Sequence, residues 1–231
     1  MSDRPHYGID APPLPFVLGA AGAACALAAL RLPAARTPLA LAGAVLLAGA
    51  GVYFHTTLRG KFRVWDEILD GTGLRGDERL LDMGCGRGAV LIAAARRLPR
   101  GRAVGVDLWS FDQSGNRPDA TLANAAAAGV ADRVEVQTGD MTALPFPDAS
   151  FDVVTSAMAI HNIPSAEGRR HALDEAVRVL RPGGRLVIAD PAPFTRRYAA
   201  HLGQGTPRGL GPRYWYSGPW VAASLLRAVK S

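Results

Sequence analysis

The chain has 231 residues, of which 48% are apolar, 20% charged and 7% aromatic, and its formal net charge is +6. This length accommodates one globular unit with an appendage, and the apolar fraction excludes a globally disordered chain. The positive charge is spread along the sequence instead of forming a lysine-rich run, so we expect no nucleic-acid partner.

Two uncharged stretches occupy most of the first 58 residues, at 14–30 and 38–54. Each would form about 26 Å of helix, at the lower end of what crosses a hydrocarbon core of about 30 Å. Neither predicted helix has a polar face that would suit an aqueous surface. We therefore predict an N-terminal transmembrane hairpin in residues 1–58, with the lipid bilayer as its partner, and a separate domain in residues 59–231.

Two other interpretations of the N-terminal segment compete. A signal peptide has one apolar run after a basic start, whereas this segment has two runs and no basic start. An alanine-rich helical hairpin of a soluble protein stays open, because alanine is only weakly hydrophobic. In a membrane hairpin, small residues would let the helices approach closely, and we expect such contacts at Gly19, Ala23, Gly43 and Ala44.

Basic residues flank the predicted hairpin unevenly. The side of the N-terminus and of the following domain carries Arg4, Arg59, Lys61 and Arg63, and the connection between the helices carries Arg31 and Arg36. Cytoplasmic flanks of membrane helices carry an excess of Lys and Arg. This bias therefore predicts a location in the cell membrane, with the following domain facing the cytoplasm.

Residues 59–231 alternate between short apolar strands and helices. Strands are predicted at 79–83, 103–107, 134–137, 151–156 and 185–189. Helices are predicted at 89–98, at 120–128 and after the N-cap residue Ser165. This alternation implies parallel crossover connections and an α/β fold with a doubly wound sheet. In the less regular tail, we expect a helix near 198–202 and strands near 214–216 and 224–229.

Ligands of such sheets bind beyond the carboxyl ends of the strands, where several informative residues fall. The first strand leads into a turn with Gly84, Gly86 and Gly88, which lets the backbone approach a ligand closely. Asp107 ends the second strand, where a carboxylate accepts hydrogen bonds from a ribose diol. Asp82 would repel a pyrophosphate but can receive a cationic amino-acid group.

The same turn also fits the G-x-G-x-x-A pattern of dinucleotide-binding proteins, so an NAD(P)-dependent oxidoreductase stays an alternative. Asp82 and the lack of a Tyr-x-x-x-Lys pair weigh against it. A second alternative is a non-catalytic module that binds a cofactor or a partner at the membrane.

Four ordered motifs, LLDMGCGRGA, VGVD, GDM followed by LPFPDASFDVV, and LRPGGRLVIAD, resemble the class I S-adenosylmethionine-dependent methyltransferases. The resemblance covers residues 61–190. It implies a seven-stranded, Rossmann-like methyltransferase sheet with an antiparallel last strand, which segments 212–217 and 224–229 would complete. It also implies S-adenosylmethionine as cofactor and S-adenosylhomocysteine as product.

The resemblance further implies cofactor-binding roles for residues of these motifs. They are Asp82, Gly84, Cys85, Gly86 and Gly88 at the methionine part, Asp107 at the ribose, Leu108, Asp140 and Met141 at the adenine, and Ala157 near the sulfonium. The polar loop 109–116 is longer than in the simplest members, which leaves the substrate open.

His161 follows the fourth strand, where the family places residues near the methyl acceptor. It can serve as a general base or orient the nucleophile, or it can merely cap the following turn with Asn162. No cluster with metal-ligand spacing occurs in the sequence, so we expect no metal. Together these features predict a membrane-anchored methyltransferase that acts on a small, lipophilic acceptor.

Overall fold

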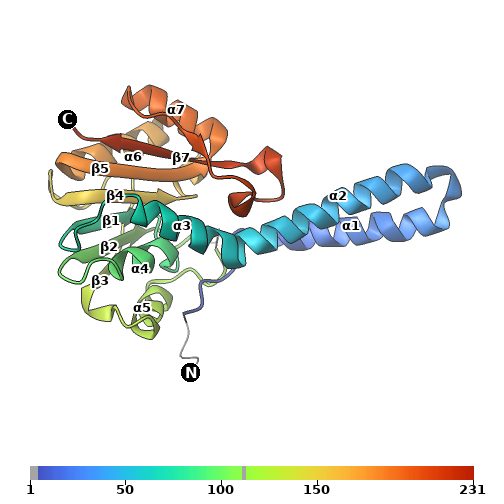
Figure 1. Cartoon of the computed structure of the whole chain (residues 1–231), viewed down its shortest axis with the longest axis horizontal. Coiled ribbons are helices and arrows are strands. Elements are labelled where there is room, and N and C mark those ends of the chain that lie inside the picture. The colour runs from blue at the N-terminus through green and yellow to red at the C-terminus, as the bar shows by residue number, and fades with distance from the viewer. Residues whose placement is uncertain (1–4, 111–112) are drawn as a thin grey trace.

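The computed structural model describes residues 5–110 and 113–231, so Arg4 and two residues of the polar loop 109–116 lie outside the described residues. A seven-stranded sheet carries helices on both faces, and two long helices project from it (Figure 1). The strands are β1 Arg79–Met83, β2 Arg102–Asp107, β3 Val134–Thr138, β4 Phe151–Ala157, β5 Leu180–Pro191, β6 Arg208–Gly209 and β7 Ala223–Val229. The helices are α1 Pro13–Arg31, α2 Arg36–His55, α3 Lys61–Asp70, α4 Ala89–Ala95, α5 Pro118–Ala127, α6 Ala166–Val179 and α7 Ala192–Leu202.

The strand order is β3-β2-β1-β4-β5-β7-β6, and the first five strands are parallel, which confirms the doubly wound α/β sheet. Side chains alternate between the two faces along each strand, as the pleat requires. Leu80 of β1 packs in the core beneath α3, α4 and α5, whereas Leu81 packs in the core beneath α6 and α7. The order reverses between β1 and β4, where ligands of such sheets bind.

The last two strands differ in part from the prediction. β7 runs antiparallel to β5, as expected, but β6 is Arg208–Gly209 and not segment 214–216. Pro212–Tyr214 forms a 3-10 turn, and Trp215 pairs with Ala222 only in an isolated bridge, so this segment does not form a strand. Instead, the buried side chains of Tyr214 and Tyr216 turn toward the base of the hairpin.

The helical hairpin is continuous with the sheet domain. α2 ends at His55, one residue after the predicted end at 54, and the helical backbone continues through a π-helical turn, Thr56–Gly60, directly into α3, which packs on the sheet. Helices α1 and α2 approach closely at Gly22 and Gly43, where a methyl group on Gly43 would lie 3.0 Å from the Gly22 carbonyl oxygen. The expected contact at Gly43 is therefore confirmed.

The other three predicted small-residue contacts of the hairpin are wrong. A methyl group on Gly19 would meet no atom within 4 Å, and Ala23 and Ala44 are exposed. In the described chain, two helical runs are long and apolar enough to cross a membrane, Pro13–Arg31 and Pro33–Asp70.

The tail from Pro212 to Val221 is held against the hairpin base, and Gly60 allows this contact. A methyl group on Gly60 would overlap the Arg213 carbonyl oxygen. We predict that Gly60→Ala destabilises the protein by about 1–3 kcal/mol, a loss of about 2–10 °C in Tm, because the tail must move away. Gly51→Ala is the matched control, because a methyl group there meets no atom within 4 Å. Thermal melts in detergent with equal losses for both variants would contradict this packing.

Candidate functional site

A cavity of about 760 Å³ lies at the carboxyl ends of β1, β2, β4 and β5, on the side from which the hairpin projects. This volume is within the range of small-molecule sites. Residues of the N-terminal segment, the hairpin base and the tail complete its wall. All the predicted site residues except Gly88 line this cavity.

The glycine turn between β1 and α4 brings backbone to the cavity. Gly84 and Gly86 have φ angles of 73° and 50°, and a methyl group on Gly84 would overlap the side chain of Ala159. Side chains are therefore excluded at both positions by conformation and by space. Gly88, with φ 85°, instead starts α4, and a methyl group there would lie 3.0 Å from Ile92 and Thr121. Gly88 does not line the cavity, and it shapes the turn into α4.

Asp107, the last residue of β2, is fixed by donors from two loops. Its carboxylate accepts hydrogen bonds from the backbone N–H of Gly86 at 2.8 Å and of Trp109 at 2.6 Å, and from Asn116 Nδ2 at 3.2 Å. The neighbouring Leu108 is 60% exposed at the cavity wall. The carboxylate thus holds the glycine turn and the following loop in one arrangement.

Asp82 is a carboxylic acid buried inside the sheet, 1% exposed, that also reaches the cavity wall. Thr155 Oγ1 donates a hydrogen bond to it at 2.8 Å. Burial raises the pKa of Asp82 to about 7, the Thr155 hydrogen bond opposes this shift, and the negative charge of Asp107 adds to it. A cation in the cavity would favour the ionised form of Asp82, so this position suits a positively charged group.

The remaining predicted cofactor residues form other parts of the wall. The exposed Asp140 accepts a hydrogen bond from the Thr142 N–H at 2.8 Å, and Met141 lies opposite Gly84. Ala157 ends β4. Burial raises the pKa of the Cys85 thiol well above its ordinary value, so this cysteine is a packing residue and not a nucleophile.

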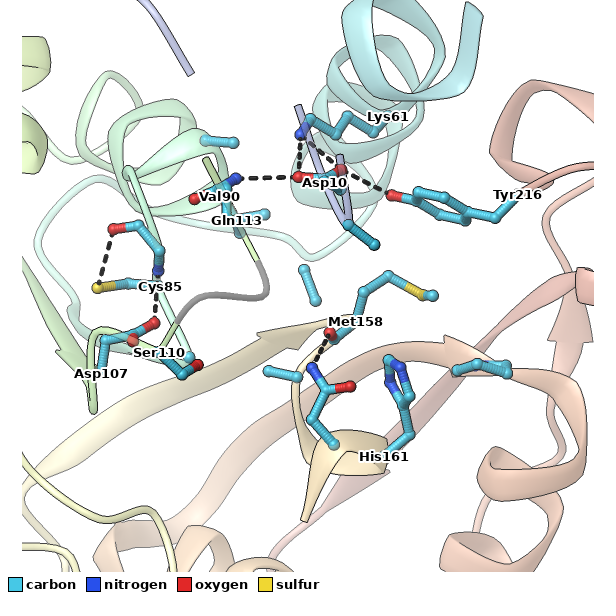
Figure 2. A pocket seen from close by; sticks show the side chains of 18 of the residues that line it. Asp10, Lys61, Cys85, Val90, Asp107, Ser110, Gln113, Met158, His161 and Tyr216 are labelled. Atoms are coloured by element: carbon cyan, nitrogen blue, oxygen red, sulfur yellow. Dashed lines mark hydrogen bonds and ion pairs between the residues drawn. The ribbon is translucent and has the colours of Figure 1, made fainter. Parts of the chain in front are cut away.

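His161 faces the cavity from the turn after β4, and its ring is held by a buried acid. Its Nδ1 lies 2.7 Å from Asp190 Oδ1, and its backbone N–H donates to Asp190 Oδ2 at 3.0 Å (Figure 2 shows His161 at the cavity). A carboxylate accepts only, so Nδ1 carries the hydrogen and Nε2 keeps a lone pair. The ring therefore does not act as a helix cap, and its basic nitrogen is available to a ligand.

Asp190 is 0% exposed and was missed in the sequence analysis. The Tyr198 hydroxyl also donates to its Oδ2 at 2.9 Å, so three donors surround the carboxylate. Burial and the charge of Asp190 raise the pKa of Tyr198, which stays a donor. The rule that identified Asp82 and Asp107, an acid near the carboxyl end of a strand, also applies to Asp190 near the end of β5.

Asp10 is a second unpredicted acid at the cavity, and it comes from the N-terminal segment before the hairpin. It accepts hydrogen bonds from Lys61 at 2.7 and 2.8 Å, from Gln113 Nε2 at 2.9 Å and from the Tyr216 hydroxyl at 3.0 Å (Figure 2). Burial alone would raise the pKa of Asp10, but the Lys61 charge and these hydrogen bonds together hold it below its ordinary value.

The residues beside Asp107 fit the ribose of S-adenosylmethionine. The Oδ1 atom of Asn116 is buried and has no hydrogen-bond partner among the described residues, and Asn116 lines the cavity. An unpaired buried acceptor costs about 1–3 kcal/mol. A sugar hydroxyl that donates to this atom would remove the cost, and Asp82 would receive the cationic amino group of the methionine part.

Asp82 also gives the stability of the free protein a characteristic pH dependence. Its folded-state pKa lies above the ordinary value near 4, so the folded state loses stability as the pH rises from about 4 to about 7. We predict that Asp82→Asn stabilises the cofactor-free protein by about 2 kcal/mol more at pH 8 than at pH 5.5. Thermal melts of both proteins at the two pH values measure this difference. The same Tm gain at both values would contradict the buried acid.

Residues 81–188 match the family model described as a methyltransferase domain. Residues of the chain are 38% identical over 128 positions to 27-O-demethylrifamycin SV methyltransferase of Amycolatopsis mediterranei, covering 55% of this chain and 44% of that protein. They are 37% identical over 132 positions to the ubiquinone/menaquinone biosynthesis C-methyltransferase UbiE of Roseobacter denitrificans, covering 57% and 50%. The chain spans about half the length of these relatives.

The fold is similar to the crystal structure of a SAM-dependent methyltransferase from Aquifex aeolicus, with a TM-score of 0.56 and 19% identity. The match covers 72% of this chain and 89% of that one. These similarities agree with the ordered motifs and with the cavity. They favour a methyltransferase over the NAD(P)-dependent oxidoreductase that the glycine pattern also allowed. Residues 81–188 therefore form a methyltransferase domain, with S-adenosylmethionine as its cofactor.

Proposed function

We propose that this protein is a membrane-anchored methyltransferase that methylates a small, lipophilic acceptor after His161 has removed a proton from it. The observation that carries the proposal is the His161–Asp190 pair, whose His161 lines the same cavity as the glycine turn and Asp107. A pair of this kind serves acceptors whose nucleophilic atom bears a proton, such as a hydroxyl group. Because the His161–Asp190 pair provides a proton acceptor in the cavity, it also argues against a non-catalytic module.

When bound, the cofactor supplies a methyl group that is already activated by a sulfonium. Nε2 of His161 accepts the proton of the acceptor, and the resulting positive charge lies beside the Asp190 carboxylate. The Tyr198 hydroxyl and the His161 N–H keep Asp190 in place. The cavity wall orients the acceptor for an in-line displacement and excludes water, which supplies most of the acceleration.

The acceptor side of the cavity supports a lipophilic substrate. Apolar side chains lie around His161 and toward the hairpin base: Leu14, Pro191, Pro193, Phe194, Trp220 and Val221. The Phe194 ring lies 5.8 Å from the His161 ring, centroid to centroid. One relative is named a ubiquinone/menaquinone biosynthesis C-methyltransferase, which agrees with a small-molecule acceptor.

Exposure of the hairpin supports the membrane anchor. In the most apolar 18-residue stretch of each helical run, only 17% and 22% of the stretch is buried. Core helices of soluble proteins, in contrast, are mostly buried. Large apolar side chains such as Leu27, Leu41 and Val45 are more than half exposed along α1 and α2. A cytoplasmic domain is supported by the exposed Arg59 and Arg63. Lys61 contributes little to this bias, because it is buried in its ion pair with Asp10.

Cofactor binding is tested by calorimetry on the full chain in detergent. We expect S-adenosylhomocysteine to bind and NAD not to bind. Asp107→Ala should weaken S-adenosylhomocysteine binding by about 1–3 kcal/mol, because a charged acceptor of the ribose hydroxyls is lost. Glu135→Ala, which removes an exposed carboxylate on β3, is the control and should bind like the wild type. Unchanged affinity of the Asp107 variant would remove the ribose assignment.

The role of His161 is tested by kinetics and binding together. His161→Ala should lower turnover about a hundredfold or more while S-adenosylhomocysteine affinity stays near that of the wild type, because only proton removal is lost. Added imidazole should restore part of the turnover of this variant. His171→Ala, an exposed histidine on α6, should have no effect. A loss confined to the melting temperature would show that His161 is only structural.

Membrane anchoring is tested by sedimentation of the full chain with membranes. Wild-type protein should stay in the pellet after alkaline washing and be released by detergent. Leu41→Arg with Val45→Arg should shift the protein to the supernatant, because a charge at the centre of a membrane helix costs about 2.5–3.5 kcal/mol. Leu41→Ala with Val45→Ala should stay in the pellet. Wild-type protein in the supernatant would refute the anchor.

A further inference from the structure

The tail turn Pro219–Val221 lies beside the mouth of the cavity, and Trp220 is its most prominent side chain. Trp220 is 67% exposed and also lines the cavity, as does Leu14 at the start of α1. An exposed tryptophan is costly in water but common at the boundary between a bilayer and water, where its ring is half apolar. A bilayer reaches Trp220 only if the tail lies close to the membrane-spanning part of the hairpin.

The tail is fixed to the hairpin, so the two move together. Thr56 Oγ1 donates to the Trp215 carbonyl oxygen at 2.5 Å, and the Tyr53 and Tyr216 rings pack edge to face at 5.1 Å. Further along α2, a methyl group on Gly49 would lie 3.1 Å from the Ser217 carbonyl oxygen. The tail therefore follows α2 from its end as far as Gly49, and Figure 1 shows the tail beside the base of α2.

Helix length then decides how deep the tail must lie. From Arg36 to His55, α2 is about 30 Å long, which matches the hydrocarbon core. Suppose that the hydrocarbon core ended at the level of Gly49, so that the tail stayed outside it. Only about 14 residues of α2, or about 21 Å, would then lie inside the bilayer, which is too short to span the hydrocarbon core. A hairpin that crosses the bilayer therefore places Ser217, and with it the start of the tail turn, about 9 Å below the end of α2.

We propose that the tail turn Pro219–Val221 is a second membrane contact, which seats the cavity mouth in the bilayer interface so that an acceptor enters from the lipid. This proposal rests on the proposed membrane anchor. The exposed Arg59 and Arg63, just beyond the end of α2, would lie at the level of anionic headgroups. The acceptor is then an amphipathic molecule. Its polar group, which bears the proton to be removed, reaches His161, while its apolar part stays between Leu14, Trp220 and the lipid.

Tryptophan fluorescence in vesicles tests this contact. The full chain is reconstituted into phosphatidylcholine–phosphatidylglycerol vesicles whose acyl chains carry bromine either near the headgroup or near the chain end. We expect the headgroup-proximal bromine to quench part of the emission, and Trp220→Phe to remove that quenched part. Trp109→Phe, a change beside β3 at the far edge of the sheet, should retain it. Because Trp220 is exposed, its replacement spares the core, and equal melting temperatures confirm this.

Flotation of the same vesicles separates the two ideas. Protein that floats with the vesicles while Trp220→Phe leaves the quenching unchanged overturns the tail contact and leaves the anchor intact. Protein that does not float overturns the anchor, and the tail contact falls with it. Quenching by the chain-end bromine alone would place Trp220 in the bilayer centre and would also overturn an interfacial seat.

Discussion

The ion pair between the buried Lys61 and the partly buried Asp10 joins the hairpin to the methyltransferase sheet. Asp10 precedes α1, Lys61 begins α3, and the other two donors to Asp10 come from the loop after β2 and from the tail. Removing Asp10 would leave the charge of the buried Lys61 without its partner, which destabilises the folded protein. The hairpin base, the cofactor loop and the acceptor wall are therefore held as one unit.

The cavity that this unit encloses has two chemically different sides. The cofactor side is built from backbone turns and carboxylates, and its acids Asp82 and Asp107 suit an ammonium group and a diol. The acceptor side carries the basic nitrogen of His161 together with apolar side chains of the same cavity wall, among them Phe194, Trp220 and Leu14. This division keeps the charged cofactor over the sheet and presents the proton-accepting group to a lipophilic molecule.

The parts of the site that follow from strand–turn–helix order could be predicted from the sequence. Glycines after β1 and acids near strand ends mark the carboxyl edge of a parallel sheet, so the positions of Gly84, Asp107 and His161 were foreseen. Asp190 obeys the same rule and was overlooked. Asp10 could not be predicted, because its partners are 51, 103 and 206 residues away in the chain. The tail was misassigned for a related reason, since packing against the hairpin, and not local propensity, decides how Tyr214 and Tyr216 turn.

Transfer of a labelled methyl group from S-adenosylmethionine to the lipid extract of a membrane tests the central claim most directly. The full chain is incubated in its source membranes with the labelled cofactor, and organic, aqueous and protein fractions are counted separately. The account predicts label in the organic fraction with wild-type protein and little with His161→Ala, although both bind the cofactor. Label confined to the aqueous or protein fraction, or equal transfer by both proteins, would contradict it.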